Sequence, residues 1–152
     1  MSTIKANAYL DSSGGNTATI NGSIPGGMTL LGTLTTTSGS TQTLSSLVLT
    51  SYKSLHLVIN GVSFVTGTAA SFSVGAGIVQ SNSNSTDFLY GMVDVDLTIG
   101  IAVPNITRGP LPAQVNSNQI AQTGYSTSTT SISVSISTST FDAGSILIYG
   151  MK

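Results

Sequence analysis

The fold of this chain is decided by VDVDLTIGIAV, residues 93–103. Every odd position of this stretch is aliphatic, whereas the even positions hold aspartate, threonine, glycine and alanine. Successive side chains of a β-strand point to opposite faces, so this alternation is typical of a strand with one buried and one exposed face. We therefore predict one strand over 93–103, with the odd positions from Val93 to Val103 in the core.

The same period of two recurs in other parts of the chain. Aliphatic residues alternate with serine over 131–137, and Leu55, Leu57 and Ile59 form a further stripe. Asn60-Gly61 directly follows that stripe, and because Asn-Gly favours tight hairpin turns, we expect the chain to turn there. Further strands are predicted at 47–49, 72–79 and 146–149.

Helices are not expected. The chain has no glutamate, β-branched residues are abundant, and no segment shows an apolar repeat of 3.6 residues. Turn residues separate the apolar runs, which is typical of all-β domains. We predict a single antiparallel β-sandwich, jelly-roll-like in topology, over residues 29–152. The turn residues are those at 14–16, 21–22, 25–27, 38–40, 60–61 and 109–110.

Three segments differ from the predicted strands. Residues 1–28 hold few large apolar side chains and many turn residues, so we predict an extended N-terminal arm. Short runs of such an arm can add as strands to an exposed sheet edge, so we expect it to fasten the protein to a neighbour. The proline-containing stretch 104–119 predicts a long surface loop, and the polar run 81–85 predicts a loop tip.

The surface is predicted to be neutral. Charged residues make up 6% of the 152 residues, against about 25% in an ordinary domain, and the formal net charge is −1. Serine and threonine together account for 47 residues. Without a basic field, the chain is not expected to bind nucleic acid or an anionic membrane. A protein with so little net charge is expected to be held in an assembly, such as a homotrimer.

Cysteine is absent from the sequence, which excludes disulfides and thiolate chemistry. The first residues contain no apolar run, so we expect no signal peptide. The apolar stretches are also too short for a membrane helix. The chain length suits one domain with one core.

Two groups of residues are candidates for catalysis or metal binding. His56, the only histidine, lies between Leu55 and Leu57 and is predicted to point away from the core. A general base needs a serine and an aspartate nearby, but serine is so common here that its proximity carries little weight. Asp94 and Asp96 would share one face of a strand, roughly 7 Å apart, where paired carboxylates suit acid–base chemistry or a hard cation such as calcium. We predict instead a solvated face that discourages strand association, with no catalytic residue, cofactor or metal.

Weaker motifs also give no support for a catalytic or cofactor-binding site. Gly75-Ala76-Gly77 lacks the third glycine, lysine and helix of a phosphate-binding loop. Tyr90 and Tyr125, near predicted loops, are candidates for a glycan platform, although isolated tyrosines more often belong to a core or an interface. Glycosylation sequons, which are expected by chance in a chain so rich in Asn, Ser and Thr, begin at Asn21, Asn84 and Asn105.

One segment, ANAYLDSSGGNTATING at 6–22, resembles a motif of virion proteins of tailed bacteriophages, especially those that infect cyanobacteria and other aquatic bacteria. In that group the motif often sits in fibre-like or head-decorating proteins. SYKSL at 51–55 and the closing GSILIYGMK at 144–152 are similar to segments of phage structural domains. The resemblance covers about a fifth of the chain, and it implies a role in the virion with no catalytic residues.

The expectation is thus a non-enzymatic capsid decoration or cement protein on the particle exterior, bound to the major capsid protein. The alternative is a receptor-binding tip or short fibre that recognises host surface glycans. A polysaccharide-degrading enzyme is disfavoured, because hydrolysis needs two well-placed carboxylates and the chain has five aspartates and no glutamate.

Overall fold

The computed structural model describes residues 27–65, 70–83, 86–109 and 118–152. These four ranges contain β-strands and no helix, so the all-β prediction is confirmed. The strands are β1 (Met28–Thr35), β2 (Thr41–Leu44), β3 (Ser54–Phe64), β4 (Ala70–Val74), β5 (Gly77–Ser83), β6 (Leu89–Asp96), β7 (Ile101–Thr107), β8 (Ala121–Gln122), β9 (Ile132–Ile136) and β10 (Phe141–Met151).

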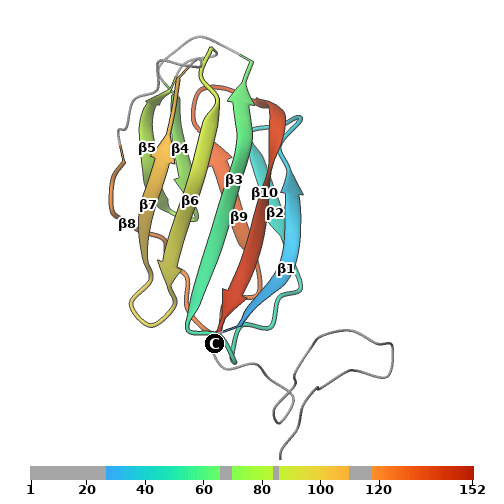
Figure 1. Ribbon diagram of the computed structural model, residues 1–152, viewed down its shortest axis with the longest axis vertical. Helices are drawn as coiled ribbons and strands as arrows, with labels where there is room; N and C mark the ends of the chain where they lie inside the picture. Colours follow the sequence, from blue (N-terminus) through green and yellow to red (C-terminus); the bar gives the residue numbers. More distant parts are fainter. Residues whose placement is uncertain (1–26, 66–69, 84–85, 110–117) are drawn as a thin grey trace, which may run out of the picture.

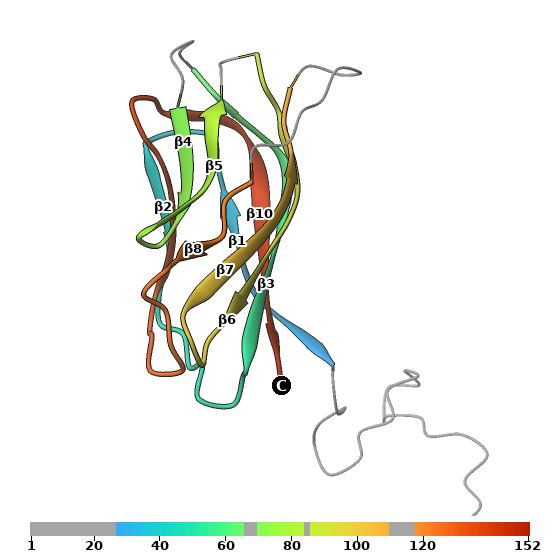
Figure 2. The same cartoon turned by 90° about the vertical axis from the view of Figure 1, so that its left-hand side faces the viewer.

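The strands form two antiparallel sheets packed face to face (Figures 1 and 2). The larger sheet has the order β1-β10-β3-β6-β7-β8, and the smaller has the order β2-β9-β4-β5. All neighbouring strands run antiparallel. The predicted sandwich is therefore confirmed.

The connectivity is that of a long hairpin wrapped over itself. β1 pairs with β10, β2 with β9, β3 with β6, and β4 with β5. The pairs β10–β3 and β4–β9 then join these ribbons into the two sheets, which is the jelly-roll arrangement of strands. β7 and β8 extend the larger sheet beyond β6. This topology confirms the jelly-roll-like prediction.

The core lies between the sheets and is built from period-two stripes. Leu55, Leu57 and Ile59 of β3 point inward, as predicted. In β9 the isoleucines and Val134 are buried, while the serines between them are only partly covered. Three phenylalanines meet in the core: the ring of Phe141 lies 6.1 Å from that of Phe64 in the same sheet and 6.4 Å from that of Phe72 in the opposite sheet.

The stretch 93–103 is a hairpin, and our prediction of one continuous strand is wrong. β6 ends at Asp96 and β7 begins at Ile101. Leu97 is still buried, with 2% of its surface exposed, but Ile99 is 60% exposed. The physical reason is a turn: Gly100 has a φ of +69° and donates its N–H to the Asp96 carbonyl at 2.8 Å. After the turn the phase reverses, so Ala102 faces the core and the other side of β7 faces outward.

The predicted hairpin turn at Asn60-Gly61 is also wrong. β3 continues through it to Phe64, and Gly61 is the extra residue of a bulge between Asn60 and Val62. Its φ of +63° is the left-handed conformation of a bulge that uses glycine as its first residue. Asn-Gly therefore supplies positive φ here without reversing the chain.

Other predicted segments are placed as follows. Residues 47–49 are not a strand, although Leu47 and Leu49 are buried and the Leu47 N–H donates to the Thr130 carbonyl at 2.9 Å. The run 72–79 is divided between β4 and β5, whereas 146–149 falls within β10. The predicted loop at 104–119 begins too early, because β7 extends to Thr107, and 81–83 belong to β5. Residues 84–85, 110–117 and 1–26 lie outside the described residues, and Met28, assigned to the arm, opens β1.

Candidate functional site: the outer face of the larger sheet

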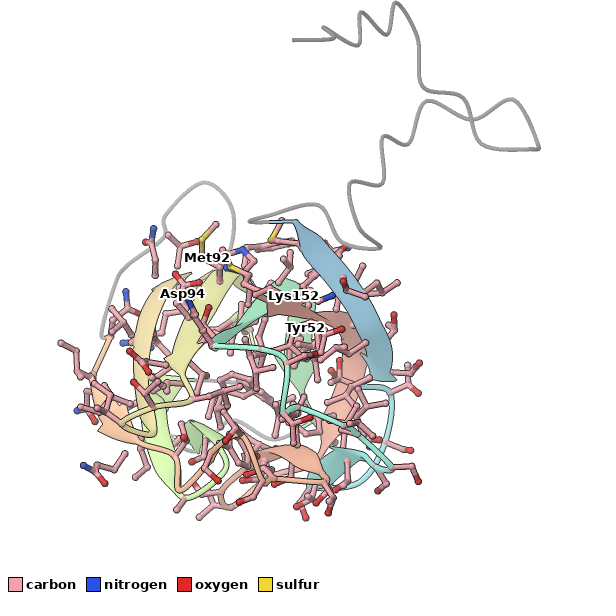
Figure 3. All side chains as sticks on the ribbon, turned by 90° about the horizontal axis from the view of Figure 1, so that it is seen from below. Tyr52, Met92, Asp94 and Lys152 are labelled. Carbon is pink, nitrogen blue, oxygen red and sulfur yellow. The ribbon has the colours of Figure 1, made fainter. Side chains whose placement is uncertain are left out.

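The larger sheet has an outward surface that no other element of the described chain covers with a second layer (Figure 2). The alternation of side chains along each strand identifies the residues of this surface. On β3, Leu57 points into the core while His56 and Val58 point outward, and on β6 the buried Val93 alternates with the exposed Met92 and Asp94. Figure 3 shows Met92 and Asp94 together on the outer side of the sheet. We call this surface the outer face.

Strand register arranges the outer face in rows that run across β1, β10, β3, β6 and β7. Each row contains one residue from each of these strands. The upper row is Thr33, Leu147, Val58, Met92 and Asn105; the middle row is Leu30, Tyr149, His56, Asp94 and Val103; the lower row is Met28, Met151, Ser54, Asp96 and Ile101.

The outer face is largely apolar. Met28, Leu30, Met92 and Val103 are exposed, and the aliphatic and aromatic side chains between them are half-buried. Three of the four methionines in the chain lie here, at positions 28, 92 and 151. A solvated sheet face normally carries polar side chains, so this composition is unusual for a sheet surface that is exposed to solvent.

One polar pair lies at the centre of the outer face. The His56 Nδ1 is 2.5 Å from the Asp94 Oδ1, and the two side chains are 16% and 55% exposed. The prediction that His56 points outward is confirmed. The contact joins β3 to β6 between directly opposed residues, so the carboxylate orients the imidazole. Within the described residues no serine is hydrogen-bonded to His56, so the contact supplies two of the three members of a serine–histidine–aspartate triad.

Asp96 is engaged separately from Asp94. Its Oδ1 accepts hydrogen bonds from the Thr98 hydroxyl at 2.5 Å and from the Thr98 N–H at 2.7 Å. These bonds stabilise the charged carboxylate, and together they lower the pKa of Asp96 below its usual value of 3.8. Asp96 thus fixes the β6–β7 turn. The prediction that it lies in the middle of a regular strand is wrong, because β6 ends at this residue. Across the described ranges, no group of three or more His, Cys, Asp or Glu residues is placed to hold a metal ion.

The remaining sequence candidates lie elsewhere. Tyr125 is buried, and its hydroxyl donates to the Ser133 carbonyl at 2.9 Å and accepts from the Ser133 N–H at 2.7 Å, so it ties two segments together and offers no platform. Tyr90 is half-buried in β6 with its ring near Gly61. Residues 75 and 76 form the β4–β5 turn and Gly77 opens β5; the Ala76 N–H donates to the Thr123 carbonyl at 3.1 Å. Of the sequon asparagines, Asn105 is exposed on β7, and Asn21 and Asn84 lie outside the described residues.

The outer face was missed by the sequence reasoning. Its signal is the presence of apolar residues in the outward phase of strands, such as Val58 between two core residues and Met92 before Val93. A second missed feature is the Arg108–Asp87 ion pair, 3.1 Å long, whose side chains are 16% and 7% exposed. It links the segment just before β6 to the residue after β7.

The chain matches no protein-family model, no curated protein and no solved structure. No membrane-spanning helix is found within the described residues.

Proposed function

We propose that this chain is a structural protein of a tailed-bacteriophage particle, most simply a decoration or cement protein that binds the major capsid protein on the particle exterior. Its action is protein–protein contact and not catalysis. The observation that carries the proposal is the outer face: a broad, methionine-rich sheet surface with the His56–Asp94 pair at its centre. Contiguous apolar surface of this kind is typical of a surface that another protein covers.

The charge distribution supports a role within an assembly. The chain carries a formal net charge of −1, and each of the four described aspartates bonds to a histidine, arginine, serine or threonine side chain. A surface dominated by hydroxyl groups lacks the charge that keeps free proteins apart, but neutral side chains lose little hydration when they enter a large contact.

The phage-like segments give the proposal its particular form. SYKSL at 51–55 enters β3, and GSILIYGMK at 144–152 makes up most of β10. β3 and β10 are adjacent central strands of the larger sheet, so both segments contribute to the sheet that bears the outer face. The resemblance therefore concerns the structural element on which the proposal rests.

The test is the copy number of this chain on purified particles, measured by quantitative mass spectrometry against the major capsid protein. A decoration protein follows the capsid lattice, so we expect on the order of hundreds of copies in a fixed ratio to the capsid protein. A count in the tens would favour the alternative, a receptor-binding tip or short fibre that recognises host glycans. Absence from the purified particles would contradict the proposal in both forms.

A further inference from the structure

We infer that the outer face binds the outer face of a second copy of this chain, as a two-fold symmetric pair of stacked sheets. The inference rests on the proposed function and deepens it, because it names a second copy of this chain as the protein that covers the outer face and leaves attachment to the capsid to another part of the chain. It concerns the isolated protein, however, and is tested without any phage particle.

The side chains of the outer face favour a protein as its partner. Methionine and aromatic side chains are enriched in protein interfaces, and the thioether adapts its shape to an opposing surface. Met28, Met92, Met151 and Tyr149 supply such side chains. A nucleic acid would need a basic surface, but Asp94 and Asp96 accompany the single histidine on this face.

A two-fold arrangement of the outer face then favours a second copy of this chain as that protein. Consider a two-fold axis parallel to the strands that passes between β3 and β6. It lays β3 of one copy over β6 of the other, and β10 over β7, while each row faces the same row of the partner. Sheets stack in this nearly aligned way at about 10 Å separation in β-sandwiches.

In this arrangement the middle row is complementary to itself. His56 of each copy faces Asp94 of the other, and Tyr149 faces Val103. The existing bond uses Nδ1 of His56 and Oδ1 of Asp94. Within the described residues, Nε2 and Oδ2 have no hydrogen-bond partner, so they are the atoms that a facing pair could use. The two pairs would close into one four-membered polar cluster, which satisfies polar groups that burial would otherwise leave unpaired.

The neighbouring rows agree with this arrangement. In the upper row Met92 faces Val58, an apolar contact on each side of the axis. In the lower row Asp96 faces Ser54 and not a second carboxylate, so no like charges oppose one another. A pair formed in this way is self-complementary, as a two-fold interface must be.

The size of the outer face suits such a pair. Five strands about 4.8 Å apart and about eight residues long, at about 3.3 Å per residue, give a face of roughly 600 Å². A stable interface covers about 800 Å² per partner, with a lower limit near 600 Å². The stacked faces therefore reach the range of a stable dimer without any contribution from the sandwich edges.

The experiment measures the mass of the full-length chain in solution by light scattering and sedimentation. We expect twice the chain mass of 15.4 kDa. Met92→Asp places a carboxylate against Val58 of the partner and should weaken the dimer by at least about tenfold. Val48→Asp is the matched control, because Val48 is 74% exposed but lies in the β2–β3 connection outside the outer face. It should leave the mass unchanged.

A pair of charge variants tests the two-fold geometry itself. His56→Asp opposes carboxylates across the axis, and Asp94→Lys opposes basic groups, so each variant alone should be monomeric. Mixed together, the acidic variant faces the basic one, and the mass should return to that of a dimer. Circular dichroism and thermal melting of each variant check that it is folded before mixing.

Three results would overturn the inference. A wild-type monomer excludes the pair. In a monomer, rapid oxidation of Met92 by peroxide would mean that the outer face is uncovered, and protection of Met92 would mean that residues 1–26 of the same chain cover it. A wild-type oligomer unaffected by Met92→Asp places the contact elsewhere. A trimeric mass, as expected from composition, contradicts two-fold pairing. Each result is independent of the copy number on particles, so this inference and the proposed function fail separately.

Discussion

Gly61 and Gly144 meet where the two longest strands of the larger sheet bulge. Gly61 is the extra residue of β3, and Gly144, with a φ of +98°, lies opposite in β10 between Ala143 and Ser145. A Cβ at position 144 would lie 2.5 Å from the Gly61 carbonyl oxygen. The two backbones approach too closely for a side chain, so glycine at 144 is required by both conformation and space.

Gly144→Ala should therefore destabilise the fold strongly. Positive φ costs an alanine about 1–2 kcal/mol, and overpacking against backbone adds about 1–3 kcal/mol. Gly124→Ala is the matched control, because Gly124 has a φ of +75° but no atom within 4 Å of the added Cβ. Chemical denaturation should show a loss of about 1–2 kcal/mol for Gly124→Ala and a clearly larger loss for Gly144→Ala. Equal losses would mean that β10 shifts to admit the methyl group.

At the scale of elements, the β6–β7 hairpin shows how one alternation can conceal a turn. Asp96 and Gly100 both occupy even positions of 93–103, so the pattern stays regular while the chain reverses. The turn residues Leu97 and Ile99 share the odd phase, yet the first is buried and the second exposed. Their exposure separates a hairpin from a continuous strand.

Substitution of those two residues tests the hairpin. Leu97→Ala removes buried methyl groups and should lower the free energy of unfolding by about 2–5 kcal/mol. Ile99→Ala, at an exposed position, should change it by at most about 0.5 kcal/mol. Urea unfolding followed by circular dichroism measures both. A large loss of unfolding free energy at Ile99 as well would favour the continuous strand over 93–103 that the alternation predicts.

Pattern and structure agree where one face of a strand is buried. The stripes of β3 and β9 are predicted residue by residue, because alternation reports burial directly. The outward direction of His56 follows from the same rule. Its contact with Asp94 does not, because the two residues are 38 positions apart and meet only through the β3–β6 register. Similarly, Gly61 supplies the same positive φ to a turn or to a bulge, and only its pairing partners distinguish the two.

At the scale of the whole molecule, the wrapped hairpin unites the beginning and the end of the described chain. Met28 of β1 pairs with Met151 of β10, so both leave the sandwich at the same end, the lower end in Figure 1. Residues 1–26 precede this point and contain the phage-like segment 6–22. Residues 1–26 therefore join the described chain at the end of the sheet that carries the lower row of the outer face.

A truncated chain that starts at Gly27 separates folding from attachment. All buried hydrophobic residues of the described chain lie between Leu34 and Ile148, so the sandwich should fold without the first 26 residues. We expect unchanged β-sheet circular dichroism, a cooperative melting transition and, because the outer face is intact, an unchanged mass in solution. Residues 1–26 carry only Lys5 and Asp11 as charges and have too little apolar surface to fold alone, yet short runs such as 4–10 can add to a sheet edge of a neighbour. Attachment to bare capsids should therefore be lost, as measured by co-sedimentation against the full-length chain. If the truncated chain saturated capsids with the affinity of the full-length chain, residues 1–26 would not be the fastening segment.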